Sequence, residues 1–587
     1  MLNTINNPKK HRAMLNVLRH EKGIAQPLTL MLDLAVICKA LNASERALLI
    51  KGSHQQKVAG KLAERFGDAQ LSEINAEMIA AHAFSVNEAQ RREIVSLILE
   101  ENILDETYAV YIQQLLRADS NRFEGLGIPD ALAELLVDIV CPQDKVPTNV
   151  VLCGNRSPEY TLAASAKHQV TQLPTTDKAY AQQYLKLLYL ADRSTHAISE
   201  NDMAIFHPET PFEAAILSEP FGVAKYKPLL SSNKYSRLSS ELVQAEALMK
   251  RVDGRIACLV RTGLLSMTSG DDAAFKQALL KAGLLEAVIQ LPERLLSVTA
   301  IPVAIMVINT RGGFDQVTMI DASSADFYTD ASRSERTLTN TQTILALLAG
   351  EHSTFKESIA AEMLLNASAN IHVNRYVKTE KQKKADQHLS QYELVHLQDI
   401  AEVRVCQMIK SIPEGDIAED SEKIQQISQQ NINRMGQIDT QTTKTIVPEE
   451  SQENRINNQI LQHGDILFST KGIIGICGLV KAPAVGMIPN QSFVIIRLRN
   501  NPYYPSPKAL FLYLRSALCS TLLDAQVTGA AMKVIKTQDM KMLKIPVITH
   551  DEQQALEQEY QSLLQLDEQR QALEAEINAG LNRIWPV

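Results

Sequence analysis

The chain has 587 residues, of which 45% are hydrophobic and 21% are charged, and its formal net charge is −8 at pH 7. A chain of this length is too long for one hydrophobic core, so we expect about two to four domains. No window approaches about 18 uninterrupted apolar residues, and the first residues lack the apolar core of a signal peptide, so we expect a cytoplasmic protein without a membrane span. The seven cysteines form no CxxC pair, which argues against a disulfide framework and against a zinc site.

Residues 1–120 are predicted to form a helical N-terminal domain. Apolar residues recur at spacings of three and four through LTLMLDLAVICKAL (28–41) and AQRREIVSLILEENIL (89–104), which is the periodicity of a helix with one buried face. No hairpin signal centred on Gly or Asn interrupts these two stretches.

In residues 121–375, helical stretches alternate with short runs rich in β-branched residues. This alternation predicts right-handed βαβ units and a largely parallel, buried sheet, which binds ligands at the carboxyl ends of its strands. The expected helices are 130–140 and 271–283, and the expected strands are 148–154, 255–261, 284–292, 302–310 and 317–323.

The remaining sequence divides into three parts. Residues 376–394 are polar and highly charged and are predicted to be a linker. Residues 395–550 combine short strands with turn residues, and their Gln/Asn/Glu-rich stretch 419–441 is predicted to be an exposed or partly mobile insertion. Residues 551–587 are predicted to form one long helix.

Apolar residues of this last helix follow a seven-residue a/d pattern, which Arg570 and Gly580 interrupt. The pattern predicts a coiled coil that serves as a dimer seam or as a helical spacer. The alternative is that these side chains pack on their own domain. The predicted seam consists of Leu556, Leu563, Leu566, Leu573 and Ile577.

The average charge hides a local asymmetry. Residues 471–550 contain ten Lys and Arg but only two acids, whereas residues 551–587 contain eight acids and two arginines. This asymmetry indicates parts with different partners, the basic part facing polyanions. The alternative is an ordinary solvated basic face.

Residues 254–309 carry a resemblance to a known family. A helix is followed by Leu284–Ile289, then Leu291-Pro292, then Thr299-Ala300-Ile301-Pro302, and then a strand that ends in Asn309. This order resembles the modification subunit of type I restriction–modification systems, which are adenine-specific DNA methyltransferases. The resemblance implies a Rossmann-like methyltransferase fold for residues 121–375.

The C-terminal third resembles the specificity subunit of the same systems, which chooses the DNA sequence. LQHGDILFSTKGIIGICGLV (461–480) and NQSFVIIRL (490–498) are similar to late strands of a target-recognition domain. LKIPVITHDEQQALEQ (543–558) is similar to the exit from that domain into its spacer helix. The resemblance implies an α/β multidomain chain with one target-recognition domain at 395–550, built to dimerise.

The catalytic motif that the family carries is altered here. In that motif an Asn or Asp oxygen and a proline carbonyl accept the hydrogens of the adenine amine, and an aromatic ring stacks on the flipped base. In LSEPFGVAKY (217–226), Ser218 and Glu219 stand in place of the Asn/Asp and the first proline, while Pro220 and Phe221 remain. A serine oxygen lies nearer the backbone and would not reach the amine, so we expect a remnant without catalytic residues.

The cofactor motif is altered as well. Gly154 survives from the glycine-rich loop that binds S-adenosylmethionine in the family, but Asn155–Pro158 fill the rest of that loop. Gln172 stands where a carboxylate should accept from the cofactor ribose, and Asp202 is at most a remnant of a later acidic position. We therefore expect no bound cofactor and no metal.

We interpret the chain as a sequence-specific DNA-binding pseudo-methyltransferase, the recognition component of a restriction-like or anti-phage defence complex. Expected partners are double-stranded DNA, a second copy or a similar chain, and nuclease or translocase subunits. One alternative is an active adenine-specific DNA methyltransferase that uses S-adenosylmethionine, and another is a protein scaffold without DNA reading. The side chains expected to contact DNA are Lys471, Lys481, Arg497, Arg499, Lys533, Lys536, Lys541 and Lys544.

Overall fold

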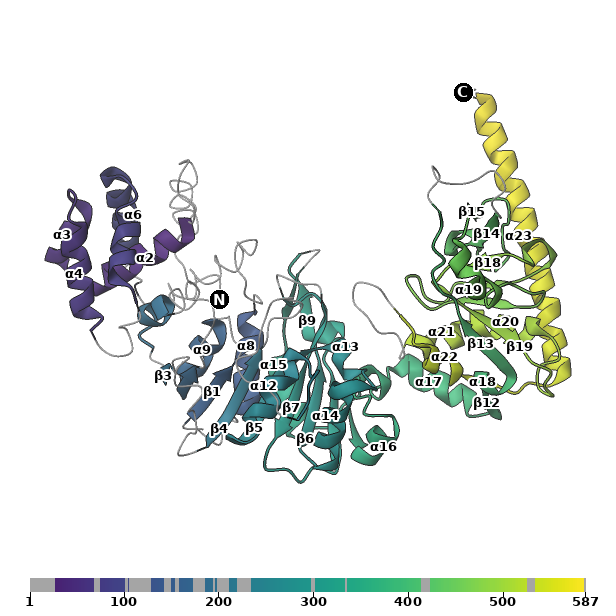
Figure 1. The fold of residues 1–587 in the computed structure, drawn as a ribbon, viewed down its shortest axis with the longest axis horizontal. Coiled ribbons are helices and arrows are strands. Elements are labelled where there is room, and N and C mark those ends of the chain that lie inside the picture. Colours follow the sequence, from purple (N-terminus) through teal and green to yellow (C-terminus); the bar gives the residue numbers. More distant parts are fainter. Residues whose placement is uncertain are drawn as a thin grey trace. The chain divides into compact units, whose positions relative to one another are not determined.

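The chain divides into two compact units, Met1–Val377 and Lys378–Val587 (Figure 1). The division falls inside the stretch 376–394 that the sequence predicts as a linker, but most of that stretch is helical, because α17 spans Glu380–Leu389 and Thr379 caps it. The computed structural model describes residues 27–67, 74–100, 104, 128–141, 149–153, 158–172, 185–193, 196–197, 211–218, 234–296, 301–332, 335–412, 423–524 and 534–584.

The N-terminal part of the first unit is helical over its described residues, as its periodicity predicts. Asp33 of α2 is buried and forms an ion pair with Lys186 (2.5 Å) and a hydrogen bond with Nδ1 of His82 (2.7 Å), so its carboxylate has two partners in place of water. The helices are α2 (Pro27–Ala40), α3 (Ala43–Ile50), α4 (Gln55–Arg65), α5 (Ala76–Ala83) and α6 (Glu88–Glu100).

A nine-stranded sheet forms the centre of the first unit, in the order β11-β8-β6-β7-β5-β4-β1-β2-β3. Strand β7 runs antiparallel to β5 and β6, β11 runs antiparallel to β8, and the other neighbouring pairs are parallel. The strands are β1 (Asn149–Cys153), β2 (Gln169–Gln172), β3 (His196–Ala197), β4 (Phe212–Ser218), β5 (Val252–Arg261), β6 (Leu285–Gln290), β7 (Val303–Asn309), β8 (Gln316–Asp321) and β11 (Lys356–Ala360).

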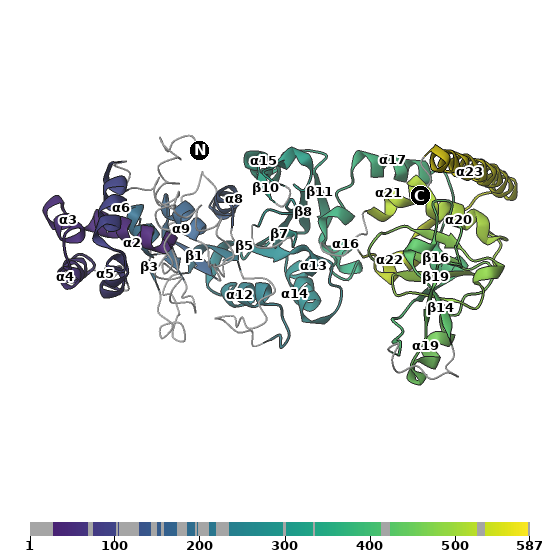
Figure 2. The same ribbon diagram turned by 90° about the horizontal axis from the view of Figure 1, so that it is seen from above.

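Helices cover both faces of this sheet (Figure 2). Alternate residues of one strand enter opposite cores, so Val150 and Leu152 pack with α8 (Asp130–Val140), α9 (Pro158–Ser165) and α15 (Thr341–Ala349). Figure 2 shows α8 and α15 on one face and α12 and α14 on the other. The second face carries α12 (Ser240–Leu248), α14 (Gly270–Lys281) and α16 (Ala361–Asn366). This mixed sheet with helices on both faces agrees with the α/β architecture that the sequence predicts.

Short elements complete the first unit. Helix α13 directly follows β5, and the pair β9-β10 forms a small antiparallel sheet of its own. Their bounds are α13 (Thr262–Leu265), β9 (Tyr328–Asp330) and β10 (Arg336–Leu338), with 3-10 turns at Ala325–Phe327 and Val373–Arg375.

The second unit is built on two small sheets, β13-β19-β16-β17 and β15-β14-β18, and the pair β12-β20. Its strands are β12 (Leu394–His396), β13 (Ala401–Val405), β14 (Ile424–Ile427), β15 (Lys444–Ile446), β16 (Ile466–Ser469), β17 (Cys477–Leu479), β18 (Ile488–Pro489), β19 (Phe493–Leu498) and β20 (Lys544–Pro546). Its other helices are α18 (Leu397–Ile400), α19 (Glu453–Asn457), α20 (Pro507–Arg515), α21 (Ala517–Asp524), α22 (Thr537–Lys541) and α23 (His550–Ile584), with 3-10 turns at Gln429–Asn431, Glu450–Gln452 and Ala482–Ala484.

The Gln/Asn-rich stretch 419–441 is predicted as an exposed or partly mobile insertion, and many of its described residues are exposed. From residue 423 onward it forms β14 and a turn that packs on the domain. The cause is Asn431, which is buried: its Oδ1 accepts from the backbone N–H and the hydroxyl of Ser428, and its Nδ2 donates to Thr442. The Asn431 side chain thus bonds to residues on both sides of the turn. Such hydrogen bonds allow a stretch of polar residues to adopt one fixed conformation.

The C-terminal stretch forms one long helix, α23, as predicted. One face packs on its own unit through Gln553, Tyr560, Leu564 and Asp567, which are all buried. The predicted seam residues lie on the other face and are 43% to 61% exposed, so they do not pack on their own domain. Among the described helices, none is both long and apolar enough to cross a membrane.

Candidate nucleic-acid interface and the carboxyl edge of the sheet

The parallel strands β1, β4 and β5 end at the same edge of the large sheet, where such sheets bind ligands. Cys153, Ser218 and Arg261 are the last residues of these strands. Ser218 is buried at the end of β4, and the Cys153 thiol donates to Oε1 of Gln244 (3.3 Å). The predicted remnants Gly154, Asp202, Glu219, Pro220 and Phe221 lie outside the described residues.

An ion pair between a partly exposed arginine and a buried carboxylate occupies the end of β5. Arg261 donates from Nε to Oε1 of Glu241 (2.5 Å) and from Nη2 to Oε2 (3.3 Å), and Glu241 is almost fully buried on α12. This carboxylate is therefore a structural partner of Arg261 rather than a ligand for a base or a cofactor.

The predicted alterations of the cofactor motif lie at or after the ends of β1 and β2. Strand β1 ends at Cys153 and helix α9 begins at Pro158, while residues 154–157, which include Gly154, lie outside the described residues. Strand β2 ends at Gln172, where the resemblance implies a carboxylate for the ribose hydroxyls of the cofactor. In the described part of the chain, no group of His, Cys, Asp and Glu side chains could hold a metal ion.

Three basic side chains of the second unit form ion pairs or hydrogen bonds with other residues of the same unit. Arg497 donates from Nε and Nη2 to the two oxygens of buried Asp465, both at 2.7 Å, and 18% of the arginine side chain is exposed. Lys508 pairs with Glu557 at 3.3 Å, and Arg515 donates to backbone carbonyls. The structure thus gives Arg497, predicted to contact DNA, a structural role, because a bidentate pair leaves its guanidinium little freedom.

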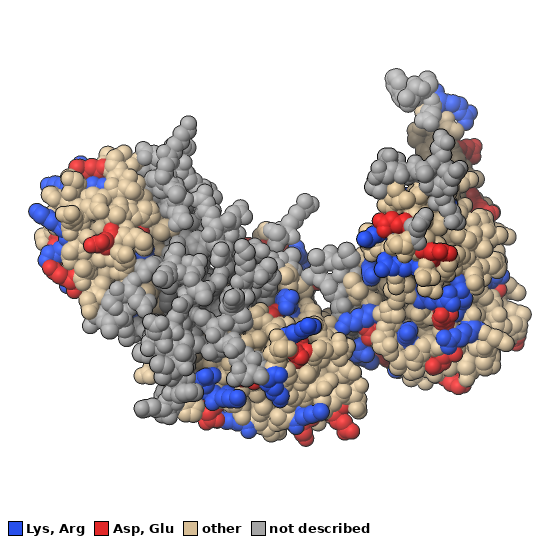
Figure 3. All heavy atoms as spheres, viewed as in Figure 1, with Lys and Arg blue, Asp and Glu red and all other residues tan. Residues whose placement is uncertain are grey.

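The other predicted contacts are at least partly exposed wherever they are described. The N–H of Ile535 donates to the carbonyl of Thr470 (2.9 Å), and Lys471 forms a β-bridge with Val534. These bonds bring Lys471 and Lys536 onto adjacent segments. In Figure 3, Lys and Arg side chains gather on the visible face of the C-terminal unit, with some acids among them. Apart from Arg497, the predicted contacts within the described residues are Lys471, Lys481, Arg499, Lys536, Lys541 and Lys544, while Lys533 lies outside them.

A cavity of about 630 Å³ opens beside Lys471. Three segments line it, 428–430, 471–476 and 490–492, and they contribute amides from Gln429, Gln430, Asn490 and Gln491. The sequence singles out the stretches 419–441, 461–480 and 490–498, which contain these three segments, but only the tertiary fold brings them together. Residues 490–492 form the turn between β18 and β19.

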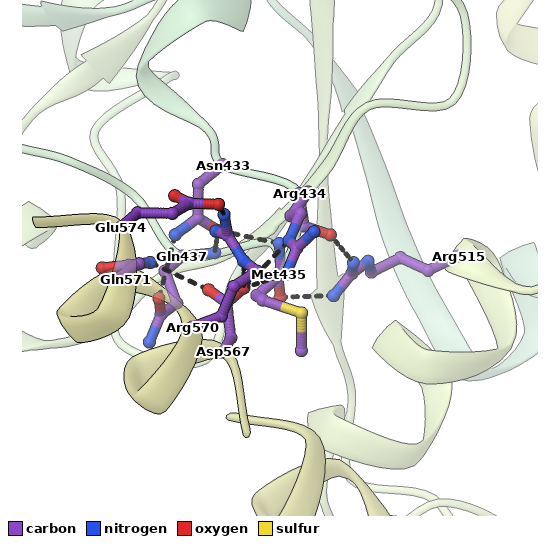
Figure 4. A network of polar contacts seen from close by, with 9 residues as sticks. All are labelled: Asn433, Arg434, Met435, Gln437, Arg515, Asp567, Arg570, Gln571 and Glu574. Atoms are coloured by element: carbon purple, nitrogen blue, oxygen red, sulfur yellow. Dashed lines mark hydrogen bonds and ion pairs between the residues drawn. The ribbon is translucent and has the colours of Figure 1, made fainter. Parts of the chain in front are cut away.

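A polar network holds the turn 433–437 against α23 (Figure 4). Arg434 donates from Nε to Oδ1 of Asp567 (2.9 Å), and Arg515 donates to the carbonyls of Arg434 and Met435. The hydroxyl of Tyr560 donates to the same carbonyl of Met435 at 2.7 Å. The hydrogen bond from Arg434 holds the pKa of Asp567 below its usual value. The turn 433–437 and the long helix α23 are therefore joined by side chains from both sides.

Several of the solved structures that are similar to this chain are proteins of restriction–modification systems. The type I restriction-modification methyltransferase subunit from Streptococcus thermophilus is 16% identical, with a TM-score of 0.48 over 63% of this chain and 99% of that chain. The type IIG restriction endonuclease BpuSI is 10% identical, with a TM-score of 0.43 over 94% of this chain and 75% of that chain. The type I system S subunit from M. genitalium is 16% identical, with a TM-score of 0.22 over 33% of this chain and 44% of that chain.

Two family models match the sequence. Residues 241–385 match the N-6 DNA methylase family, and residues 390–583 match the type I restriction modification DNA specificity domain. No curated protein matches the sequence. The two matches confirm the predicted union, in one chain, of a segment resembling the modification subunit and a segment resembling the specificity subunit.

Proposed function

We propose that this chain, in which an N-6 DNA methylase segment precedes a type I specificity domain, reads a DNA sequence as part of a restriction-like or anti-phage defence complex. The observation that carries the proposal is the surface of the specificity domain. Exposed basic side chains suit phosphates, which position a protein on DNA. The amides of the cavity beside Lys471 suit base edges.

We further propose that the methyltransferase segment is catalytically inactive and holds no cofactor. Ser218 is buried at the end of β4, where the chemistry needs an Asn or Asp oxygen aimed at the adenine amine. Glu219 removes the rigid proline that would fix the second acceptor. Asn155–Pro158 and Gln172 replace the residues that would hold S-adenosylmethionine.

The competing function is an active adenine methyltransferase, favoured by the match of residues 241–385 to a family that depends on S-adenosylmethionine. Calorimetry with S-adenosylmethionine and transfer of a labelled methyl group to duplex DNA separate the two functions. We expect neither binding nor transfer. A label on adenine that Phe221→Ala abolishes would establish the active enzyme.

For partners we propose a second copy or a similar chain, joined through the exposed face of α23, and nuclease or translocase subunits. Each chain carries one specificity domain, so two domains held apart by paired helices would read a split site with a fixed gap. The proposal draws support from the apolar side chains that α23 exposes at a/d positions.

Salt dependence tests the DNA-reading function. Contact with about five phosphates would give a log–log slope of roughly −4 to −5 for affinity against salt. Lys471→Ala combined with Lys544→Ala should weaken binding to all sequences and flatten the slope by about two. Lys281→Ala, an exposed lysine on α14 in the other unit, should leave the slope unchanged. Affinity that does not respond to salt would favour a protein scaffold instead.

A further inference from the structure

Ile473 is an apolar side chain displayed to solvent. It exposes 67% of its surface on the loop between β16 and β17. Its neighbours Ile474 and Ile476 are partly buried and pack against the hydrophobic cores of the unit. The loop therefore buries two of its three isoleucines and presents the third at the rim of the cavity.

Hydrogen bonds fix the loop that carries Ile473. The buried hydroxyl of Ser469 donates to the carbonyl of Ile473 (2.6 Å) and accepts from the N–H of Ile476 (2.8 Å). Gln429 Nε2 donates to the carbonyls of Lys471 (2.8 Å) and Ile473 (3.0 Å). Two donor groups thus make three hydrogen bonds to the carbonyls of Lys471 and Ile473, so Ile473 is held in place before any ligand arrives.

The backbone on each side of Ile473 needs glycine. Gly472 has φ +76° and Gly475 has φ +88°, both in the left-handed region. Together with the hydrogen bonds, these turns define one conformation of the loop. Such preorganisation favours a contact surface, because little ordering entropy is lost on binding.

The amides around the cavity divide into two groups. Gln429 holds the loop, and Asn490 Oδ1 accepts from the N–H (3.0 Å) and the hydroxyl (2.5 Å) of Ser492, so these two side chains position their own backbone. Gln430 and Gln491 are exposed at the rim of the same cavity. The rim therefore presents two amides, the Lys471 ammonium and one apolar side chain.

Resting on the proposed DNA-reading function, we infer that this cavity reads an A·T base pair through the major groove. A glutamine amide pairs with N6 and N7 of adenine, and an apolar side chain packs on the C5-methyl group of thymine. Gln430 and Gln491 would supply the amide, Ile473 the apolar contact, and Lys471 a neighbouring phosphate contact. The cavity would discriminate against a G·C pair, because that pair has neither the N6 donor and N7 acceptor of adenine nor the methyl group of thymine.

The test removes one methyl group at a time. The full-length protein first selects its target from a random duplex library. Each thymine of the target is then replaced by 2′-deoxyuridine. We expect the wild type to lose about fourfold in affinity at one thymine, the effect of one methyl group leaving an apolar contact. Ile473→Ala should bind the two duplexes equally, because the side chain that senses the methyl group is gone.

Matched variants complete the test. Met408→Ala, which alters another exposed apolar side chain of the same unit, should keep the sensitivity to deoxyuridine. Gln430→Ala or Gln491→Ala should relax the preference for that A·T pair by about 5- to 150-fold. A wild type indifferent to deoxyuridine everywhere, or an Ile473→Ala variant that stays sensitive, overturns the inference while DNA reading stands. Loss of salt-sensitive duplex binding altogether defeats the proposed function as well.

Discussion

Gly436 lies at the centre of the turn that α23 and α20 hold in place. Its φ is +77°, and a Cβ atom there would lie 2.5 Å from Phe511 Cζ and 2.8 Å from the carbonyl oxygen of Cys477. Both the backbone conformation and the space exclude a larger residue. The turn cannot shift away from Phe511 and Cys477, because Arg515 and Tyr560 donate hydrogen bonds to the carbonyl of the adjacent Met435.

Gly436→Ala should therefore destabilise the C-terminal unit by about 2–4 kcal/mol, the sum of backbone strain and overpacking. Denaturant unfolding followed by a probe in that unit measures the change. Gly475→Ala is the matched control, since its φ is +88° but nothing lies within 4 Å of the added Cβ; it isolates the backbone cost. An equal loss of unfolding free energy in the two variants would contradict this prediction, because it would show that the neighbours of residue 436 move to accommodate the added methyl group.

All seven cysteine thiols are free and buried. Burial raises the pKa of Cys38, Cys141, Cys406 and Cys519 to about 12, so the reactive thiolate is scarce at pH 8. We expect the native protein to react slowly with a thiol reagent and the denatured protein to release seven equivalents. Ser562→Cys, at an exposed position of α23, should add one fast equivalent. A fast thiol in the unmodified chain would contradict this prediction.

At the scale of elements, the contact between the turn 433–437 and α23 should depend on pH. The pKa of Asp567 is lowered by Arg434, so the carboxylate contributes stability above its unfolded pKa of about 3.9 and loses it as the pH falls through the lower folded value. Once corrected for the intrinsic exchange rate, the protection of the turn amides against hydrogen exchange should therefore fall only below about pH 4.

Asp567→Asn should make exchange of the turn fast at neutral pH and remove the acid transition. Asp551→Asn, an exposed acid on the same helix, should change neither. If the turn of Asp567→Asn stays as protected as in the wild type, the carbonyl contacts from Arg515 and Tyr560 hold it without the ion pair.

Elements that depend on local sequence could be predicted. Residues 255–261 and 302–310 form neighbouring strands of the large sheet, and 130–140 coincides with α8, because long apolar runs and helical periodicity need no distant partner to be recognised. The exposed stripe of α23 followed from its heptads in the same way.

The candidate site could be predicted only in part. The loop 469–475 lies within the stretch 461–480 that carries the resemblance to a target-recognition domain, but its fixed shape depends on Gln429, 42 positions away from Lys471. Arg497 was assigned to DNA because its charge is visible in the sequence, whereas its partner Asp465, 32 positions away, is not recognisable as such. Side-chain pairings across a domain decide which charges are available, and no local pattern encodes them.

At the scale of the whole molecule, self-association tests the role of α23. Leu566→Glu combined with Leu573→Glu places charges in the proposed seam without touching the buried face of the helix. Light scattering should report a shift from dimer to monomer, because a coiled coil does not accommodate paired charges at d positions. Gln569→Glu, exposed on the same helix, should remain dimeric.

These substitutions test the interface more specifically than truncation of the chain near residue 550 does. Truncation would also remove Tyr560 and Leu564 from the core of the recognition unit. A double glutamate variant that stays dimeric would exclude the exposed face of α23 as the interface.

The buried thiols make the unmodified chain a ready background for cross-linking. A single cysteine introduced on the exposed face of α23 would be the one readily oxidised position in each copy. In a parallel pair, the same position of two copies lies face to face, so each single variant forms a covalent dimer. In an antiparallel pair, only mixtures of two different variants do so. The pattern of bridges along α23 would then give the direction in which two recognition units point along a duplex.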